Sequence, residues 1–462
     1  MEWVARSCGV VGLVLVVVAM TIGCGESSTD GQQDDCSPVS CSELEVECGE
    51  HFDGCDDVID CGSCGSDEQC VEGMCLEESQ CDPLSCDDVG FECGEHTDGC
   101  GEVIDCGSCG DDHSCSDGFC LFDAPPQKEA FFTDPGDDGE ENDYALEEAI
   151  KQLLEEAEPG SSVHGAMYTW SRGEMADAFI DAWDRGVSVY LLIGSEYAAV
   201  DTLKEALPED NVYVCRRDGE PSGCHGGPIN HNKFFLFSSL SDGSRDVVVQ
   251  SSANLTNPQL SQNNNLVVIR DDVGLYQLFR HYWHDMRRDI DDLHYFWSAE
   301  GDTGTKAYFF PRRYADSNTG ENDPVVEEFD AIDCSAGAEV HIAQSRWSWA
   351  RRGVAHRTAQ LAEDGCSVHV LVRQDFTTDD LLAILEGGGV EVTLYPHNHS
   401  KYFMVDGHYG GDDRKVVWTG AMNFTSPGLR SNDEALVRIE DDDIYDAYRN
   451  DWQTMKDHPG AQ

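Results

Sequence analysis

The chain has 462 residues, and its 90 Asp and Glu side chains against 29 Lys and Arg give a formal net charge of −61. A chain this acidic lacks the broad basic surface that most sequence-independent nucleic-acid binding requires. We therefore expect no nucleic-acid partner. The length suggests two or three domains, and a hydrophobic content of 40% excludes wholesale disorder. The 22 cysteines, most of them in one short region, indicate an oxidising compartment.

The first 23 residues are typical of an export signal. Val10 to Ile22 is an apolar run too short for a comfortable membrane span. The small residues before Cys24 and the polar residues after it resemble the lipobox of bacterial lipoproteins. This resemblance implies a signal peptide at 1–23, acylation of Cys24 and a tether at 24–35, with the chain held on a membrane of the cell envelope, periplasmic or at the surface. The alternative is an uncleaved N-terminal anchor helix.

A duplicated cysteine-rich segment follows, at 36–80 and 81–123. Eight cysteines of the first repeat recur 45 residues later in the second. Repeats of this size bury little core, so cross-links must supply their order. The Cys61-x-x-Cys64 and Cys106-x-x-Cys109 spacings also occur in zinc sites, but an exported chain with an even cysteine count favours disulfides, whose connectivity the sequence leaves open. We favour a protease-resistant stalk over a ligand-binding module.

A change of composition separates this segment from the rest of the chain. Between Gly25 and Asp123 there are 29 acidic residues and no Lys or Arg. Ala124-Pro125-Pro126 then marks a linker, because proline interrupts regular structure. We expect two further units, at 124–298 and 299–462.

The second part of the chain contains the same order of elements twice. Helices alternate with buried strands, which is typical of parallel βαβ units. The expected helices are 146–157, 176–184, 325–332 and 354–363, and the expected strands are 162–168, 186–193, 339–343 and 365–372. The fold class is therefore α/β, and Cys215 with Cys224 and Cys334 with Cys366 are plausible disulfides.

Each unit also contains a polar strand that carries His-x-Lys. We expect strands at 231–237 and 399–406, in which His231 and Lys233, or His399 and Lys401, project to one side. One such pair is weak evidence, since it fits a surface strand. Two copies 168 residues apart, each followed by a Val-rich strand and an asparagine, indicate a site.

These motifs resemble the phospholipase D superfamily, whose pattern is His-x-Lys-x4-Asp, then Gly-Ser-x-Asn, then Glu or Asn. The resemblance covers roughly residues 130 to 455. Some positions match and some depart. The matching residues are His231, Lys233, Ser252, Asn254, His399, Lys401, Asp406, Asn423 and Glu434. Ser238 and Ala421 stand where the pattern has Asp and Ser, and Asn265 occupies the last position in place of the acid that Glu434 keeps. The resemblance implies two tandem α/β/α units sharing one cleft.

The resemblance also implies roles for these residues. His231 is the expected nucleophile and His399 the expected general acid and base, although the pseudo-symmetry allows the reverse. Lys233, Lys401, Asn254 and Asn423 would stabilise the phosphate oxygens. Ser252, Asn265, Asp406 and Glu434 would support them, with Glu434 or Asn265 orienting an imidazole. No metal or other cofactor is expected.

Three functions agree with the sequence. The first is a lipid-anchored phosphodiesterase that cleaves the terminal phosphodiester of phospholipids through a phosphohistidine, with transfer to an alcohol in place of hydrolysis left open. The second is a nuclease of the same fold, and the third a non-catalytic surface-binding protein. We expect a monomer. The pair Arg351-Arg352 is interpreted as solvated, against the alternative of a phosphate-flanking position.

Overall fold

The computed structural model describes most of the chain beyond residue 127 and parts of the segment before it. The described residues are 40–41, 48, 50–52, 58–65, 68–71, 74–77, 85–86, 93–97, 102–109, 113–116, 119–122, 127–137, 139–302 and 304–462. The predicted signal peptide, Cys24, the tether and the linker at 124–126 lie outside them. Within the described ranges, every helix is too short or too polar to cross a membrane.

The chain divides into two compact units. One comprises Met1–Phe91 with Glu95–Cys106, and the other comprises Glu92–Gly94 with Gly107–Gln462. Both copies of the predicted α/β unit belong to the second of these.

The cysteine repeats form small hairpins in the same order twice. The strands are β1 (Glu50–Phe52), β2 (Val58–Asp60), β3 (Glu68–Val71) and β4 (Met74–Glu77), and then β5 (Glu95–Thr97), β6 (Val103–Asp105), β7 (His113–Ser116) and β8 (Phe119–Phe122). Each strand starts 45 residues after its counterpart, and each pair is antiparallel. The structural repeat therefore follows the sequence repeat.

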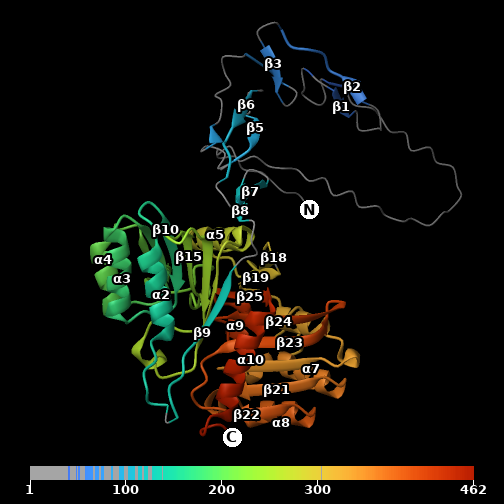
Figure 1. The fold of residues 1–462 in the computed structure, drawn as a ribbon. Helices are drawn as coiled ribbons and strands as arrows, with labels where there is room; N and C mark the ends of the chain where they lie inside the picture. Colours follow the sequence, from blue (N-terminus) through green and yellow to red (C-terminus); the bar gives the residue numbers. More distant parts are fainter. Residues whose placement is uncertain are drawn as a thin grey trace, which may run out of the picture. The chain divides into compact units, whose positions relative to one another are not determined.

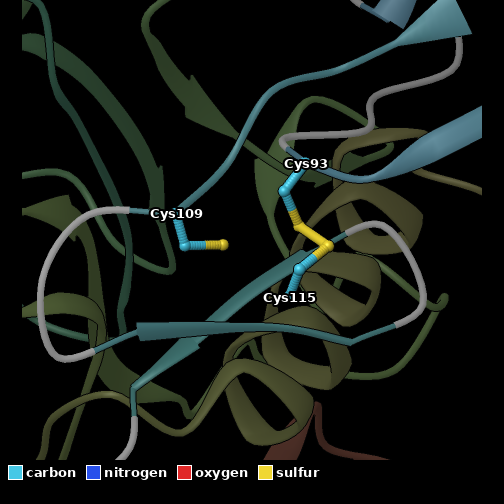
Figure 2. A group of neighbouring side chains, drawn as sticks. All are labelled: Cys93, Cys109 and Cys115. Carbon is cyan, nitrogen blue, oxygen red and sulfur yellow. A yellow bond between two sulfur atoms is a disulfide. The ribbon is translucent and has the colours of Figure 1, made fainter.

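Cross-links confirm the interpretation of the cysteines as disulfides. Cys41–Cys61 in the first repeat has the counterpart Cys86–Cys106 in the second, and Cys93 is joined to Cys115. Figure 2 shows the latter bond with Cys109 beside it, and Cys64 and Cys109 are disulfide-bonded as well. Both Cys-x-x-Cys spacings are thus used by disulfides.

The first α/β half is built on a seven-stranded sheet of order β12-β11-β10-β15-β16-β17-β9. Its strands are β9 (Lys128–Phe132), β10 (Ser162–Met167), β11 (Ser188–Ile193), β12 (Val212–Val214), β15 (Lys233–Ser239), β16 (Arg245–Ser251) and β17 (Asn265–Ile269). Strands β10 and β11 are parallel, as predicted, and β12 is added parallel to β11, whereas β15, β16, β17 and β9 are antiparallel. The small hairpin β13 (Arg216–Arg217) and β14 (Glu220–Pro221) lies between Cys215 and Cys224, which form the predicted disulfide.

The second half repeats this order and adds one edge strand. Its sheet runs β22-β21-β20-β23-β24-β25-β19-β18. The strands are β18 (Trp297–Glu300), β19 (Thr305–Phe310), β20 (Glu339–Gln344), β21 (Ser367–Val372), β22 (Glu391–Leu394), β23 (Lys401–Tyr409), β24 (Asp412–Gly420) and β25 (Glu434–Glu440). The predicted disulfide Cys334–Cys366 is present here.

Helices cover both faces of the two sheets (Figure 1). Those of the first half are α2 (Ala145–Glu156), α3 (Gly173–Asp184), α4 (Ala198–Ala206) and α5 (Val273–Arg287), and those of the second are α6 (Pro324–Asp330), α7 (Arg352–Glu363), α8 (Asp379–Gly387), α9 (Ser426–Arg430) and α10 (Asp442–Asp457). Each half has its own apolar core, and a third core, which includes α5 and α10, contains residues of both halves. The predicted α/β class with two α/β/α units is therefore confirmed.

One basic residue interpreted as solvated is instead fully buried. The side chains of Arg351 and Asp323 are 0% exposed, and two guanidinium nitrogens donate to the two carboxylate oxygens at 2.8 and 2.9 Å. Asp323 also accepts from the backbone N–H of Val325 at the start of α6. The ion pair therefore joins the start of α6 to the segment before α7, and Arg351 contributes structure rather than surface charge.

We expect Arg351→Met to lower the free energy of unfolding by about 3–5 kcal/mol, because it leaves the Asp323 carboxylate buried without its partner. Arg352→Met, at the partly exposed neighbouring position, should change it by less than about 1 kcal/mol. Urea unfolding followed by circular dichroism measures both. Equal effects would contradict the importance of the buried pair.

Candidate active site

The candidate active site lies where the two halves meet, at two backbone contacts of the same form. The N–H of His231 donates to the carbonyl of Asp433 at 2.9 Å, and the N–H of His399 donates to the carbonyl of Asn263 at 2.8 Å. Each histidine is therefore held by a segment of the opposite half. Both are adjacent to the carboxyl ends of parallel strands, where ligands bind in open α/β sheets.

The predicted strands begin two residues later than expected. Strand β15 starts at Lys233 and β23 at Lys401, because the preceding histidines bond across to the other half instead of to a neighbouring strand. Each lysine still lies beside its histidine. The Lys233 ammonium donates to the His231 carbonyl at 2.8 Å, and Nζ of Lys401 is 3.0 Å from Nδ1 of His399.

A carboxylate of the second half orients His231. Nδ1 of His231 is 2.8 Å from Oε2 of Glu434, which is fully buried. An ionised carboxylate only accepts hydrogen bonds, so Nδ1 carries the proton and Nε2 keeps its lone pair. The amide of Asn432 donates to the other Glu434 oxygen at 3.1 Å. This is the orienting role expected for Glu434.

An amide of the first half orients His399, and it is not the predicted one. Oδ1 of Asn264 is 2.8 Å from Nδ1 of His399, while its Nδ2 donates to two backbone carbonyls, of Gln259 and Gln262. The residue predicted here, Asn265, instead accepts from the backbone N–H of Lys401 at 3.2 Å. The loop after the first asparagine is one residue shorter than its counterpart, so the equivalent of Glu434 is Asn264.

The other predicted residues are divided between the cleft and its surroundings. Asn423 lines a cavity of about 480 Å³ together with His231, whereas Asn254 lines a separate small cavity against α2. The Ser252 hydroxyl donates to Asn264 at 3.4 Å and accepts from the N–H of Asn265, so it supports the amide that holds His399. Asp406 is paired with Glu339 near the far end of β23, away from Lys401.

Four cleft residues were not identified from the sequence. Tyr168 lines the cavity, 5.1 Å from the ring of His231 between centroids, and Arg346 and Phe376 line it as well. The guanidinium carbons of Arg346 and Arg373 lie 4.2 and 4.8 Å from the centre of the Phe376 ring. Tyr168, Arg346 and Arg373 each follow a parallel strand within two residues, which is the signal that would have located them.

The sequence matches the family described as "Cardiolipin synthase, PLD-like domain" over residues 150–289 and 331–456, more than half of the chain. The chain belongs to this family. The expected membership of the phospholipase D superfamily is thereby confirmed, with one PLD-like match in each half. Comparison with curated proteins gives no match.

Solved structures are similar to this chain at low sequence identity. A polyphosphate kinase from Porphyromonas gingivalis is 10% identical with a TM-score of 0.51, over 72% of this chain and 48% of the kinase, so this chain matches about half of its length. A phosphatidylserine synthase from Haemophilus influenzae is 15% identical over 73% and 87% of the two chains, with a TM-score of 0.49. The phospholipase D family member Nuc from Salmonella typhimurium is 18% identical over 36% and 95%, with a TM-score of 0.27.

The two lysines of this PLD-like cleft are buried, which disfavours their charged forms. Burial lowers the pKa of Lys233 to about 7, against the attraction of Glu434, and burial beside Lys233 holds the pKa of Lys401 well below its ordinary value. Burial and the Lys401 ammonium likewise depress the pKa of His399, and burial lowers that of His231 although Glu434 opposes the shift. A bound phosphate would relieve this repulsion.

We expect Lys233→Met to raise the melting temperature by a few degrees at pH 6 and by less at pH 9. The pKa of Lys233 in the fold, about 7, lies below its unfolded value of about 10.4, so the cost of charging the buried amine grows as the pH falls and is complete below pH 7. Thermal unfolding measures the shift.

Inorganic phosphate should stabilise the wild type and have less effect on Lys233→Met, because the anion gains its affinity from the buried ammonium. Lys204→Met, which removes an exposed lysine paired with Glu196, is the control and should respond like the wild type. A melting temperature of Lys233→Met below that of the wild type at pH 6 would contradict the interpretation.

Proposed function

We propose that this protein is a membrane-anchored phosphodiesterase that cleaves the terminal phosphodiester of phospholipids through a phosphohistidine on His231. The observation that carries the proposal is the pair of histidines, each oriented from the opposite half and each beside a buried lysine. Membership of the cardiolipin synthase PLD-like family supports the substrate class. The lipobox-like residues around Cys24 support attachment to a membrane of the cell envelope.

The unequal partners of the two histidines support the assignment of roles. A phosphorylated imidazole with a proton on its other nitrogen is cationic, and a carboxylate stabilises it better than an amide does. Glu434 bonds His231, whereas Asn264 bonds His399. His231 is therefore the nucleophile, and His399 is the proton donor and acceptor.

The reaction then has two balanced steps. The Nε2 lone pair of His231 forms a bond to phosphorus as the bond to the head-group oxygen breaks. The anionic phosphodiester offsets the neighbouring cations that depress the pKa of His399, so that a His399 imidazolium can form and give its proton to that oxygen. The neutral His399 next takes a proton from water or an alcohol, whose oxygen displaces His231 from phosphorus. Lys233 and Lys401 stabilise the phosphate oxygens in both steps.

The lining of the cavity supports a phospholipid. Apolar side chains, including Ile229 and Phe376, stand beside the polar groups, and Trp349, next to the cavity residue Ser348, is 42% exposed. Such aromatic side chains suit the boundary between head groups and acyl chains. The arginine at the cavity, Arg346, disfavours a cationic choline, so we propose an uncharged alcohol such as glycerol as the head group.

Vesicle assays test the substrate. We expect release of glycerol from phosphatidylglycerol at least tenfold faster than release of choline from phosphatidylcholine, measured in chelator, and no shortening of single-stranded DNA. His231→Ala and His399→Ala should each abolish release, and His408→Ala, at a partly exposed histidine outside the cleft, should not. Cleavage of DNA alone would establish the nuclease. Cleavage of none of the substrates would favour a non-catalytic binding protein.

A substrate with a nitrophenol leaving group tests the roles. Nitrophenolate leaves without a proton donor, so His399→Ala should release about one equivalent per chain in a burst and then stop as the phosphohistidine accumulates. His231→Ala should give no burst. Mass spectrometry of the trapped His399→Ala protein should locate the phosphoryl group on His231, and a label on another residue would refute the assignment.

A further inference from the structure

A second cluster of chemically active side chains lies in the second half, on three neighbouring strands. His341 of β20 is paired in register with His369 of β21, which is paired with Glu391 of β22. Glu339 is two residues before His341, so the two side chains project from the same face of the sheet. The cluster lies toward the amino end of β20, whereas Lys401 of the cleft is paired with Gln344 at its carboxyl end.

The three innermost groups have the separations of metal ligands. Oε1 of Glu339 is 3.3 Å from Nε2 of His341 and 3.7 Å from Nε2 of His369, and the ligand atoms of the three residues all lie within 4.8 Å of one another. Ligands at 2.0–2.2 Å from a tetrahedral zinc ion are separated by about 3.3–3.5 Å. Small side-chain rotations therefore bring these atoms onto one ion.

His341 has a buried imidazole that the fold leaves without a hydrogen bond. The side chain is 0% exposed, and neither ring nitrogen forms a hydrogen bond with any described residue. A buried polar atom without a partner is uncommon and calls for an explanation.

His369 is already oriented as a ligand would be. Its Nδ1 is 2.9 Å from the Glu391 carboxylate, so Nδ1 carries the proton and Nε2, which is 3.7 Å from Glu339, keeps its lone pair. Histidines that bind zinc usually donate their other nitrogen to a carboxylate in this way. The ammonium of Lys456 donates to the second oxygen of Glu391 at 2.6 Å. The Ser367 hydroxyl is hydrogen-bonded to Nε2 of His369 at 2.9 Å, and a bound ion would displace this hydroxyl.

Negative charge also gathers at this end of the sheet. Asp406 stands directly opposite Glu339 in the antiparallel pair, and like charges in that position repel. Arg449 lies 3.7 Å from Glu339 and offsets part of the charge. A bound ion would replace Arg449 as the partner of Glu339. The guanidinium of Arg449, whose side chain is 31% exposed, would then move into solvent.

The first half supplies an internal comparison. His164 packs against Trp283 as His341 packs against Trp452, with ring centroids 4.8 and 4.7 Å apart. The indole N–H of each tryptophan donates to the backbone of the strand that carries the histidine. The packing of a strand histidine against a tryptophan ring is thus a structural feature of both halves. At the positions of Glu339 and His369, however, the first half has Ser162 and Tyr190.

We propose that Glu339, His341 and His369 bind one zinc ion, with water as the fourth ligand and Glu391 orienting His369. Sequence analysis predicted no metal ligands in this half, because the three residues are dispersed over 31 positions and only the sheet brings them together. The ion would link adjacent strands at a distance from the cleft. Its role is therefore structural, and the proposal is independent of the reaction assigned to His231.

The test uses the full, oxidised chain, dialysed against chelator and then titrated with zinc chloride. We expect one zinc per chain by elemental analysis after gel filtration and a rise in melting temperature of several degrees. Cobalt(II) in place of zinc should give the visible absorption of a tetrahedral site. Zinc should not change the rate of phosphodiester cleavage, so failure of one proposal leaves the other standing.

Variants assign the site. His369→Gln and Glu339→Gln, both at partly exposed positions that the fold tolerates, should each weaken zinc binding at least tenfold without changing the metal-free melting temperature. Glu391→Gln should weaken it by about 10–100-fold. His164→Gln, at the equivalent position of the first half, should bind zinc as the wild type does. Absence of bound zinc at micromolar concentration, or equal binding by His369→Gln and the wild type, would overturn the proposal.

Discussion

The reactive geometry of this protein depends on two hydrogen bonds that cross between its halves. Glu434 of the second half holds His231 of the first, and Asn264 of the first holds His399 of the second. Neither half is complete alone, because each supplies an imidazole without the group that fixes its tautomer. The shared core around α5 and α10 keeps these groups in register. Duplication has therefore produced one site rather than two.

The surroundings of His231 and His399 are nearly identical but differ in charge. Both histidines lie beside a buried lysine, yet only one has a carboxylate behind it. In the proposed reaction, that single difference, Glu against Asn, is what would allow one imidazole to carry a covalent phosphoryl group and the other to exchange protons. The concentration of cations at the cleft is also the reverse of the chain as a whole, whose net charge is −61.

Much of this architecture was predictable, and the exceptions have physical causes. Periodicity located the helices α2, α3, α6 and α7 and the parallel strands β10, β11, β20 and β21, and the repeated His-x-Lys motifs indicated the site. The three consecutive asparagines Asn263–Asn265 do not indicate which of them is equivalent to Glu434. The residue that bonds His399 was therefore predicted one position too late. Arg351 was interpreted as exposed because an ion pair with a residue 28 positions away leaves no local signal. The arginines of the cleft were missed because only the fold brings the strand ends together.

The repeated disulfide has a consequence for how such a protein can change. Cys41–Cys61 and Cys86–Cys106 each close within one 45-residue repeat, and so does Cys93–Cys115. Gain or loss of a whole repeat by unequal recombination would leave each of these bonds with its own partner. A change in the number of repeats would therefore break none of these three cross-links.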